Sequence, residues 1–193
     1  MEQIRSFIAI ELPEELKLAL IRLQDRLKSG SQAPVKWVDP RGIHLTLKFL
    51  GNIGTDMVSK ITLVLEESAR ETSPFRLETN ELGVFPSLQR VQVIWVGIAG
   101  EVERLNQLQQ RIESGLAPLG FAAELRKFTP HLTLARIRDQ ATPSERQNIG
   151  QLIAATRFET VTTINVNSIQ LMKSQLSREG AIYSQISLIK LRA

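Results

Sequence analysis

The chain has 193 residues, of which 42% are hydrophobic and 23% charged, proportions typical of a globular protein. It contains no cysteine, which excludes disulfides, zinc–thiolate sites and thiol nucleophiles. Lys and Arg exceed Asp and Glu by 24 to 20, a mild excess that favours anionic partners. Because no apolar run could span a bilayer and the first residues do not resemble a signal peptide, we expect a cytoplasmic protein with no membrane partner.

Two strands and two helices are expected in the first half of the chain. Residues 5–10 alternate as a strand does, and Pro13 then suits the first turn of a helix whose leucines recur at helical spacing up to Gly30. The segment 43–50 is dense in apolar and β-branched residues and predicts a second strand. A second helix is expected over 55–70.

The second half of the chain repeats this order. A strand over 91–97 precedes a helix over 101–119, which Gly120 ends, and a further strand covers 131–137. Such a duplication predicts two pseudo-symmetric lobes that face each other across a cleft.

Another helix and a hairpin complete the chain. Thr142-Pro143-Ser144-Glu145 has the spacing of a capping box, with proline in the first helical turn. Strands over 163–173 and 181–191 then form the expected hairpin.

The only two histidines, His44 and His131, each begin the tetrapeptide His-Leu-Thr-Leu. A chance match of the three following residues has a probability on the order of one in a thousand, so two unrelated core histidines are a poor explanation. In a strand, residues i and i+2 share a face. Each lobe therefore presents an imidazole and a hydroxyl (Thr46 or Thr133) on one face and directs two leucines into the core.

This arrangement suits metal-free chemistry at phosphorus. One neutral imidazole can accept a proton while a protonated one donates, and a pKa near 6.5 lets both states coexist near neutrality. The hydroxyls of Thr46 and Thr133 can donate hydrogen bonds to anionic oxygens. In-line attack needs a base on one side of the phosphorus and an acid on the other, which two opposed histidines, His44 and His131, supply.

A metal site is the main structural alternative for a histidine pair. Zinc usually takes three protein ligands, and without a third histidine or any cysteine only Asp or Glu could complete such a site. No nucleophile elbow, P-loop or dinucleotide fingerprint is present. We therefore expect no metal and no cofactor.

Taken together, these motifs resemble those of a known family. Paired His-x-Thr-x motifs are the signature of the two-histidine phosphoesterase superfamily, and within it the chain is most similar to the RNA 2′,3′-cyclic phosphodiesterases, also called the 2′-5′ RNA ligase family. The likeness covers nearly the whole chain, in the segments 5–13, 37–38, 44–51, 83–86, 95–97, 129–136 and 174–176, with Gly180 and Tyr183.

The resemblance implies an α+β fold over residues 1–193, a single two-lobed domain with two antiparallel sheets around a central basic cleft and helices on the outside. It implies hydrolysis of 2′,3′-cyclic phosphates on RNA ends to 2′-phosphomonoesters, and reversible 2′-5′ RNA ligation when an RNA 5′-hydroxyl replaces water. By the same likeness His44 is the proton donor to the leaving 3′ oxygen and His131 is the acceptor that activates water. The symmetry of the motifs leaves the reverse assignment open.

Three further residues are candidates for the site. The resemblance marks Arg136 as a phosphate ligand, but it stands five positions after His131, so it reaches the same face only through a bulge or strong twist. Lys48 stands four positions after His44, on the same face by simple alternation, where it contacts the RNA backbone or ends the sheet in solvent. Tyr183 is a candidate for lining the cleft and binding RNA.

Four aromatic residues are candidates for stacking on bases, although core packing is the better explanation for three of them. They are Phe7, Trp37, Phe49 and Trp95.

Two functions compete with the cyclic phosphodiesterase. One is an RNA-end binding protein without turnover, and the other is a small-nucleotide cyclic phosphodiesterase that differs only in cleft width. The expected partners are RNAs with 2′,3′-cyclic phosphate or 2′-phosphate ends, bound by a monomer.

Overall fold

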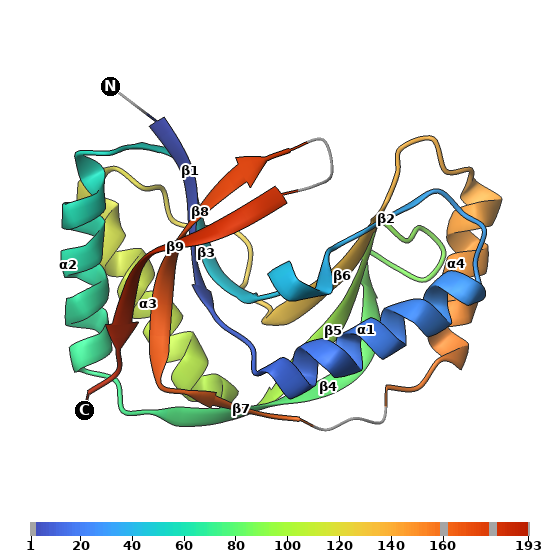
Figure 1. Cartoon of the computed structure of the whole chain (residues 1–193), viewed down its shortest axis with the longest axis horizontal. Helices are drawn as coiled ribbons and strands as arrows, with labels where there is room; N and C mark the ends of the chain where they lie inside the picture. Colours follow the sequence, from blue (N-terminus) through green and yellow to red (C-terminus); the bar gives the residue numbers. More distant parts are fainter. Residues whose placement is uncertain (1–2, 159–161, 178–180, 193) are drawn as a thin grey trace.

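Two antiparallel sheets form the framework of the molecule (Figure 1). The computed structural model describes residues 3–158, 162–177 and 181–192. The first sheet has the order β3-β1-β8-β9, made of Leu45–Gly54, Gln3–Ile10, Ser168–Leu176 and Ala181–Lys190. The second has the order β2-β6-β5-β4-β7, made of Val35–Trp37, His131–Ile137, Val93–Gly100, Phe75–Phe85 and Thr163–Val166. This confirms the expected α+β class with two antiparallel sheets.

The α-helices lie along the outer sides of the sheets (Figure 1). Helices α2 (Met57–Arg70) and α3 (Val102–Leu116) cover the first sheet, and α1 (Glu14–Ser29) and α4 (Pro143–Ala155) lie along the second. Short 3₁₀ turns, η1 (Pro40–Gly42) and η2 (Ala117–Leu119), precede β3 and follow α3.

Helices α1 and α3 each pack beside the sheet of the other lobe, not the sheet whose strand precedes them. Helix α1 follows β1 of the first sheet, yet its Gln24 amide donates to the main-chain carbonyls of Val38 (2.9 Å) and Leu134 (3.1 Å) beside the second sheet. Helix α3 follows β5 of the second sheet, yet its Glu113 pairs with Lys48 of the first sheet. Each lobe is therefore built from both halves of the sequence.

One continuous cluster of buried apolar side chains draws on both sheets. It includes the leucines of both tetrapeptides, Leu45, Leu47, Leu132 and Leu134, as their alternation predicts. The expected capping box of α4 is also present: the Thr142 hydroxyl accepts from the Glu145 amide, and the Glu145 carboxylate accepts from the Thr142 amide. None of the helices in the described ranges is long and apolar enough to cross a membrane.

The strand expected over 163–173 is wrong as a single element. The chain passes from one sheet to the other at Asn167, so that β7 pairs with β4 in the second sheet and β8 pairs with β1 and β9 in the first. Only Asn167 separates the two pieces, so the sequence pattern does not show the division. The hairpin of β8 and β9 is confirmed by pairing from Ser168 with Lys190 to Leu176 with Ala181, and Gly180 lies outside the described residues.

Candidate active site

Strand β3 carries a β-bulge directly after the first His-x-Thr. Thr46 pairs with Ala9 of β1, but Lys48, two positions on, pairs with Ile8, so the register shifts by one. The shift reverses the alternation of faces beyond Leu47. As a result Lys48 lies on the helix-covered side of the sheet, together with Ile8.

Strand β6 carries the same bulge at the same place. Thr133 pairs with Trp95 of β5, whereas Ala135 pairs with Ile94 and Arg136 with Val93. Arg136 therefore shares a face with Thr133, as the expected bulge requires, and is exposed there. In each motif the fifth residue after the histidine, not the fourth, is on the histidine's face. We call these the histidine faces of the two sheets.

The expectation that Lys48 shares the face of His44 is wrong. Its side chain is only 6% exposed, and its ammonium pairs with the Glu113 carboxylate of α3 at 2.6 Å and donates to the Ala122 carbonyl at 3.0 Å. The bulge after Thr46 is the physical reason. Lys48 is a structural residue that joins β3 to α3 and to the loop that leads to His131.

Two aromatic rings contact the His44 imidazole. Its imidazole stacks on Phe7 of β1, with ring centroids 4.4 Å apart and planes 22° apart, and meets the Tyr183 ring of β9 edge-on at 5.1 Å. Its Nδ1 lies 2.7 Å from the Gly42 carbonyl oxygen. Because a carbonyl oxygen only accepts, Nδ1 carries a proton, which leaves Nε2 to accept or donate the second one.

His131 has the same carbonyl contact on the second sheet, with a different arrangement of aromatic rings. Its Nδ1 lies 2.6 Å from the Thr129 carbonyl oxygen, again two positions earlier in the chain. Phe85 of β4 meets the imidazole edge-on at 5.1 Å, and Trp95 of β5 lies 6.2 Å away. Both histidines are thus oriented in the same way, with Nε2 as the atom available for proton transfer.

Two arginines, one from each sheet, act electrostatically on the Tyr183 phenol. Arg5 and Tyr183 share the histidine face of the first sheet, because both are in register with Ser174 of β8. Burial raises the pKa of the Tyr183 phenol, while the charges of Arg5 and of Arg136 lower it. Arg136 belongs to the second sheet, so its guanidinium acts on a ring that touches His44.

Burial lowers the pKa of the His44 imidazole below its ordinary value of 6.5; the Gly42 carbonyl and the Glu11 charge oppose the shift. Below pH 6.5 the unfolded chain then binds more protons at this residue than the folded chain. The free energy of unfolding contributed by His44 is therefore fully present above pH 6.5 and falls as the pH drops towards the folded pKa. We expect an NMR titration midpoint below 6.5 for the His44 ring. The His131→Gln variant leaves one imidazole to assign, and a midpoint at or above 6.5 would contradict the shift.

The residues that orient the histidines were only partly predicted. No role was expected for Gly42 or Arg5, and both base stacking and core packing were considered for Phe7 and Trp95. Gly42 is close to Tyr183, where an added Cβ would lie 3.1 Å from the ring, and an added Cβ at Gly83 would lie 2.3 Å from the Trp95 ring. One feature of these surroundings is short-range: in both motifs the residue two positions before the histidine supplies the carbonyl that accepts from Nδ1.

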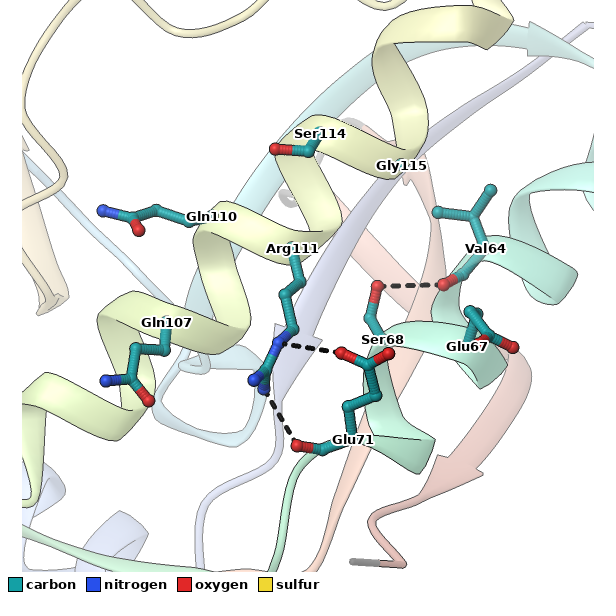
Figure 2. Close-up of a pocket in the computed structure, with 9 residues that line it drawn as sticks. All are labelled: Val64, Glu67, Ser68, Glu71, Gln107, Gln110, Arg111, Ser114 and Gly115. Atoms are coloured by element: carbon teal, nitrogen blue, oxygen red, sulfur yellow. Dashed lines mark hydrogen bonds and ion pairs between the residues drawn. The ribbon is translucent and has the colours of Figure 1, made fainter.

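The described residues contain no cluster of three or more His, Cys, Asp or Glu side chains that could hold a metal ion. A hollow of about 520 Å³ lies elsewhere, between α2 and α3 on the helix side of the first sheet (Figure 2). Its charged side chains are engaged: Arg111 reaches the Glu71 carboxylate at 3.4 Å and the Glu71 carbonyl at 3.0 Å. This hollow contains neither histidine.

Known proteins of this architecture match along the whole chain. The model of the 2′-5′ RNA ligase superfamily matches residues 12–178. The RNA 2′,3′-cyclic phosphodiesterase of Methanothermobacter thermautotrophicus is 32% identical over 98% of this chain and all of its own length, and that of Aeropyrum pernix is 33% identical over 89% and 94%. The structure of E. coli LigT complexed with 3′-AMP has a TM-score of 0.79 and 25% identity, covering 98% of this chain and 99% of LigT. The chain belongs to the 2′-5′ RNA ligase superfamily.

Proposed function

We propose that this protein is an RNA 2′,3′-cyclic phosphodiesterase that uses His44 and His131 as a proton donor and a proton acceptor, without a metal. The observation that carries the proposal is the matched pair of imidazoles, one on each sheet, each oriented through Nδ1 by the carbonyl two positions earlier. A pair built for binding alone would not need the same free nitrogen on both sides. The names of the relatives, RNA 2′,3′-cyclic phosphodiesterases, agree with this activity.

The proposed reaction is a single in-line displacement. The Nε2 atom of His131 takes a proton from water as its oxygen attacks phosphorus, and the bond from phosphorus to the 3′ oxygen breaks. The Nε2–H of His44 protonates that oxygen as it leaves. The products are a 2′-phosphomonoester and a 3′-hydroxyl. If an RNA 5′-hydroxyl attacks in place of water, the same displacement gives a 2′-5′ linkage and a 3′-hydroxyl, and its reverse re-forms the cyclic phosphate and the free 5′-hydroxyl.

The charges around His44 suit the donor role once substrate is bound. In the free protein, burial favours the neutral imidazole. An anionic phosphate beside it favours the protonated form, so binding of the substrate charges the donor. The exposed guanidinium of Arg136 and the Thr46 and Thr133 hydroxyls are the proposed ligands of the non-bridging oxygens, where negative charge grows in the transition state. Tyr183 and Arg5 extend the same face of the first sheet.

The direct test is an incubation of purified protein with EDTA and an oligonucleotide that ends in a 2′,3′-cyclic phosphate. We expect complete conversion to the 2′-phosphate. Formation of the 3′-phosphate instead would show that the 2′ oxygen, and not the 3′ oxygen, is the leaving group. Binding without turnover would identify an RNA-end binding protein, and turnover of short nucleotides alone would identify a small-nucleotide enzyme.

Removal of either threonine hydroxyl is expected to have a moderate effect. Thr46→Ala and Thr133→Ala each lose one hydrogen bond to a charged group, about 1.5–3 kcal/mol, or roughly 10- to 150-fold in kcat/KM. Thr→Ser keeps the hydroxyl and is the matched control at each position. An alanine variant with wild-type kcat/KM would exclude that threonine from the phosphate site.

A further inference from the structure

Strand β1 places a carboxylate opposite the first histidine. The last pair between β1 and β3 joins Ile10 to Leu45, so Glu11 and His44 come next in the register. Ile10 and Leu45 both point into the core, and neighbouring residues of an extended chain point to opposite faces. Glu11 therefore lies on the histidine face of the first sheet, across from the imidazole.

The second sheet has no side chain at the corresponding position. His131 pairs with Gly97 of β5, the residue that takes the place of Glu11 in the second lobe. The two His-Leu-Thr-Leu segments are identical, but the strands opposite them differ: a carboxylate faces His44, whereas a glycine faces His131. The difference breaks the pseudo-symmetry of the two lobes at the pair of imidazoles, and it does so by a charge.

Helix α1 holds this carboxylate in place. The Lys17 ammonium pairs with the Glu11 carboxylate and also lies 3.3 Å from the Glu14 carboxylate. The Lys17 side chain is only 11% exposed, so packing restricts it, whereas the side chain of Glu11 is 43% exposed. One ammonium shared by two carboxylates leaves a net negative charge on this side of His44.

We propose that Glu11 is the positioning residue that makes His44, and not His131, the proton donor. Its negative charge favours the protonated imidazole across from it, and an imidazole across from glycine has no such counter-ion. This inference rests on the proposed function, and it assigns the two roles that the identical motifs leave open. Glu11 acts through the imidazole and takes no part in the bonds that form and break.

The charges that act on His44 have the signs that this role requires. Burial lowers the pKa of the imidazole, the Gly42 carbonyl and the Glu11 charge raise it, and the Lys17 charge lowers it by less than Glu11 raises it. The Glu11–Lys17 pair therefore has a net effect in favour of the protonated form.

Titratable groups on the other elements around the imidazole do not compete with Glu11. Tyr183 of β9 meets the ring edge-on, and because burial raises the pKa of its phenol it is neutral near pH 7. Arg5 and Arg136 act on that phenol. Arg41 of η1 is paired at 2.7 Å with the carboxylate two positions earlier.

The test is the pH dependence of kcat/KM for Glu11→Gln on an RNA that ends in a 2′,3′-cyclic phosphate. The alkaline limb of the profile measures how much of the donor is still protonated, and the acid limb measures how much of the acceptor is still neutral. With His44 as donor, the alkaline limb falls relative to the acid limb, by about tenfold for each unit by which the pKa of His44 drops. With His44 as acceptor, the acid limb would rise instead.

Three further variants separate charge from packing. Glu11→Asp keeps the charge and should keep the wild-type profile. Glu15→Gln, at an exposed position in the first turn of α1, is the matched control and should also keep it. Lys17→Met removes the opposite charge, so it should raise the alkaline limb relative to the acid limb. A purely structural role of the Glu11–Lys17 pair would impair Glu11→Gln and Lys17→Met in the same direction.

An NMR titration of the His44 ring separates this inference from the proposed function, because it needs no turnover. The midpoint is expected to fall in Glu11→Gln and to rise in Lys17→Met. If the midpoint falls but no RNA is hydrolysed, the proposed function fails while Glu11 stands as the counter-ion of His44. If RNA is hydrolysed and Glu11→Gln changes neither the midpoint nor the ratio of the limbs, or raises the acid limb, the inference is overturned.

Discussion

Replacing His44 or His131 by alanine is expected to lower kcat by about 10²- to 10⁴-fold, the usual span for the loss of a general acid or base. Each imidazole is oriented by its own carbonyl, at 2.7 Å and 2.6 Å, so neither can take over the other's role. Steady-state assays on an RNA cyclic phosphate measure the loss. Binding of the 2′-phosphate product should change far less, because Arg136 and the threonines remain.

A substrate with a better leaving group separates the two histidines. A 3′-deoxynucleoside 2′-(4-nitrophenyl phosphate) keeps phosphorus on the 2′ oxygen and expels nitrophenolate in place of the 3′ oxygen, and nitrophenolate needs little protonation. If His44 is the donor, His44→Ala recovers most of its activity on this ester, whereas His131→Ala stays impaired because the attacking water still needs a base. The opposite pattern would reverse the roles. Near-normal turnover of RNA by either variant would end the proposal that the pair is catalytic.

Lys48→Met is expected to lower the free energy of unfolding by about 3–5 kcal/mol, the usual effect of removing one partner of a buried ion pair. The Glu113 carboxylate is only 14% exposed and is left without its cation, while the Ala122 carbonyl loses a donor. Urea unfolding at neutral pH measures the change.

The double variant Lys48→Met/Glu113→Leu removes both charges together. It should regain most of the lost stability, because an apolar pair of similar volume often replaces a buried ion pair without loss. Lys60→Met, at an exposed position of α2, should change the free energy of unfolding by less than about 0.5 kcal/mol. If Lys48→Met instead kept its stability and lost affinity for RNA, the expectation from simple alternation would be restored.

Local regularity made much of the fold predictable. Helical spacing of leucines, the Thr142 to Glu145 capping box and the apolar strand segments 5–10 and 131–137 are recognised from neighbours within a few positions, and the structure has all of these elements. Strand β4 was missed although 75–79 alternate in burial, because a register shift between Thr79 and Leu82 interrupts the pattern. Strand β2, with three residues, is too short to show any period.

The sequence by itself determined the elements on which the proposed chemistry rests: two identical His-Leu-Thr-Leu segments and their buried leucines. Only the tertiary structure decided which neighbours those imidazoles have. The bulge in β3 places Phe49 instead of Lys48 on the histidine face, and the bulge in β6 places Arg136 on the histidine face of the second sheet. Both bulges depend on pairing with strands far away in the chain. The exchange of helices between lobes likewise depends on which apolar face remains to be covered after the sheets form. Periodicity is a local property, whereas register and sheet membership are set by distant partners.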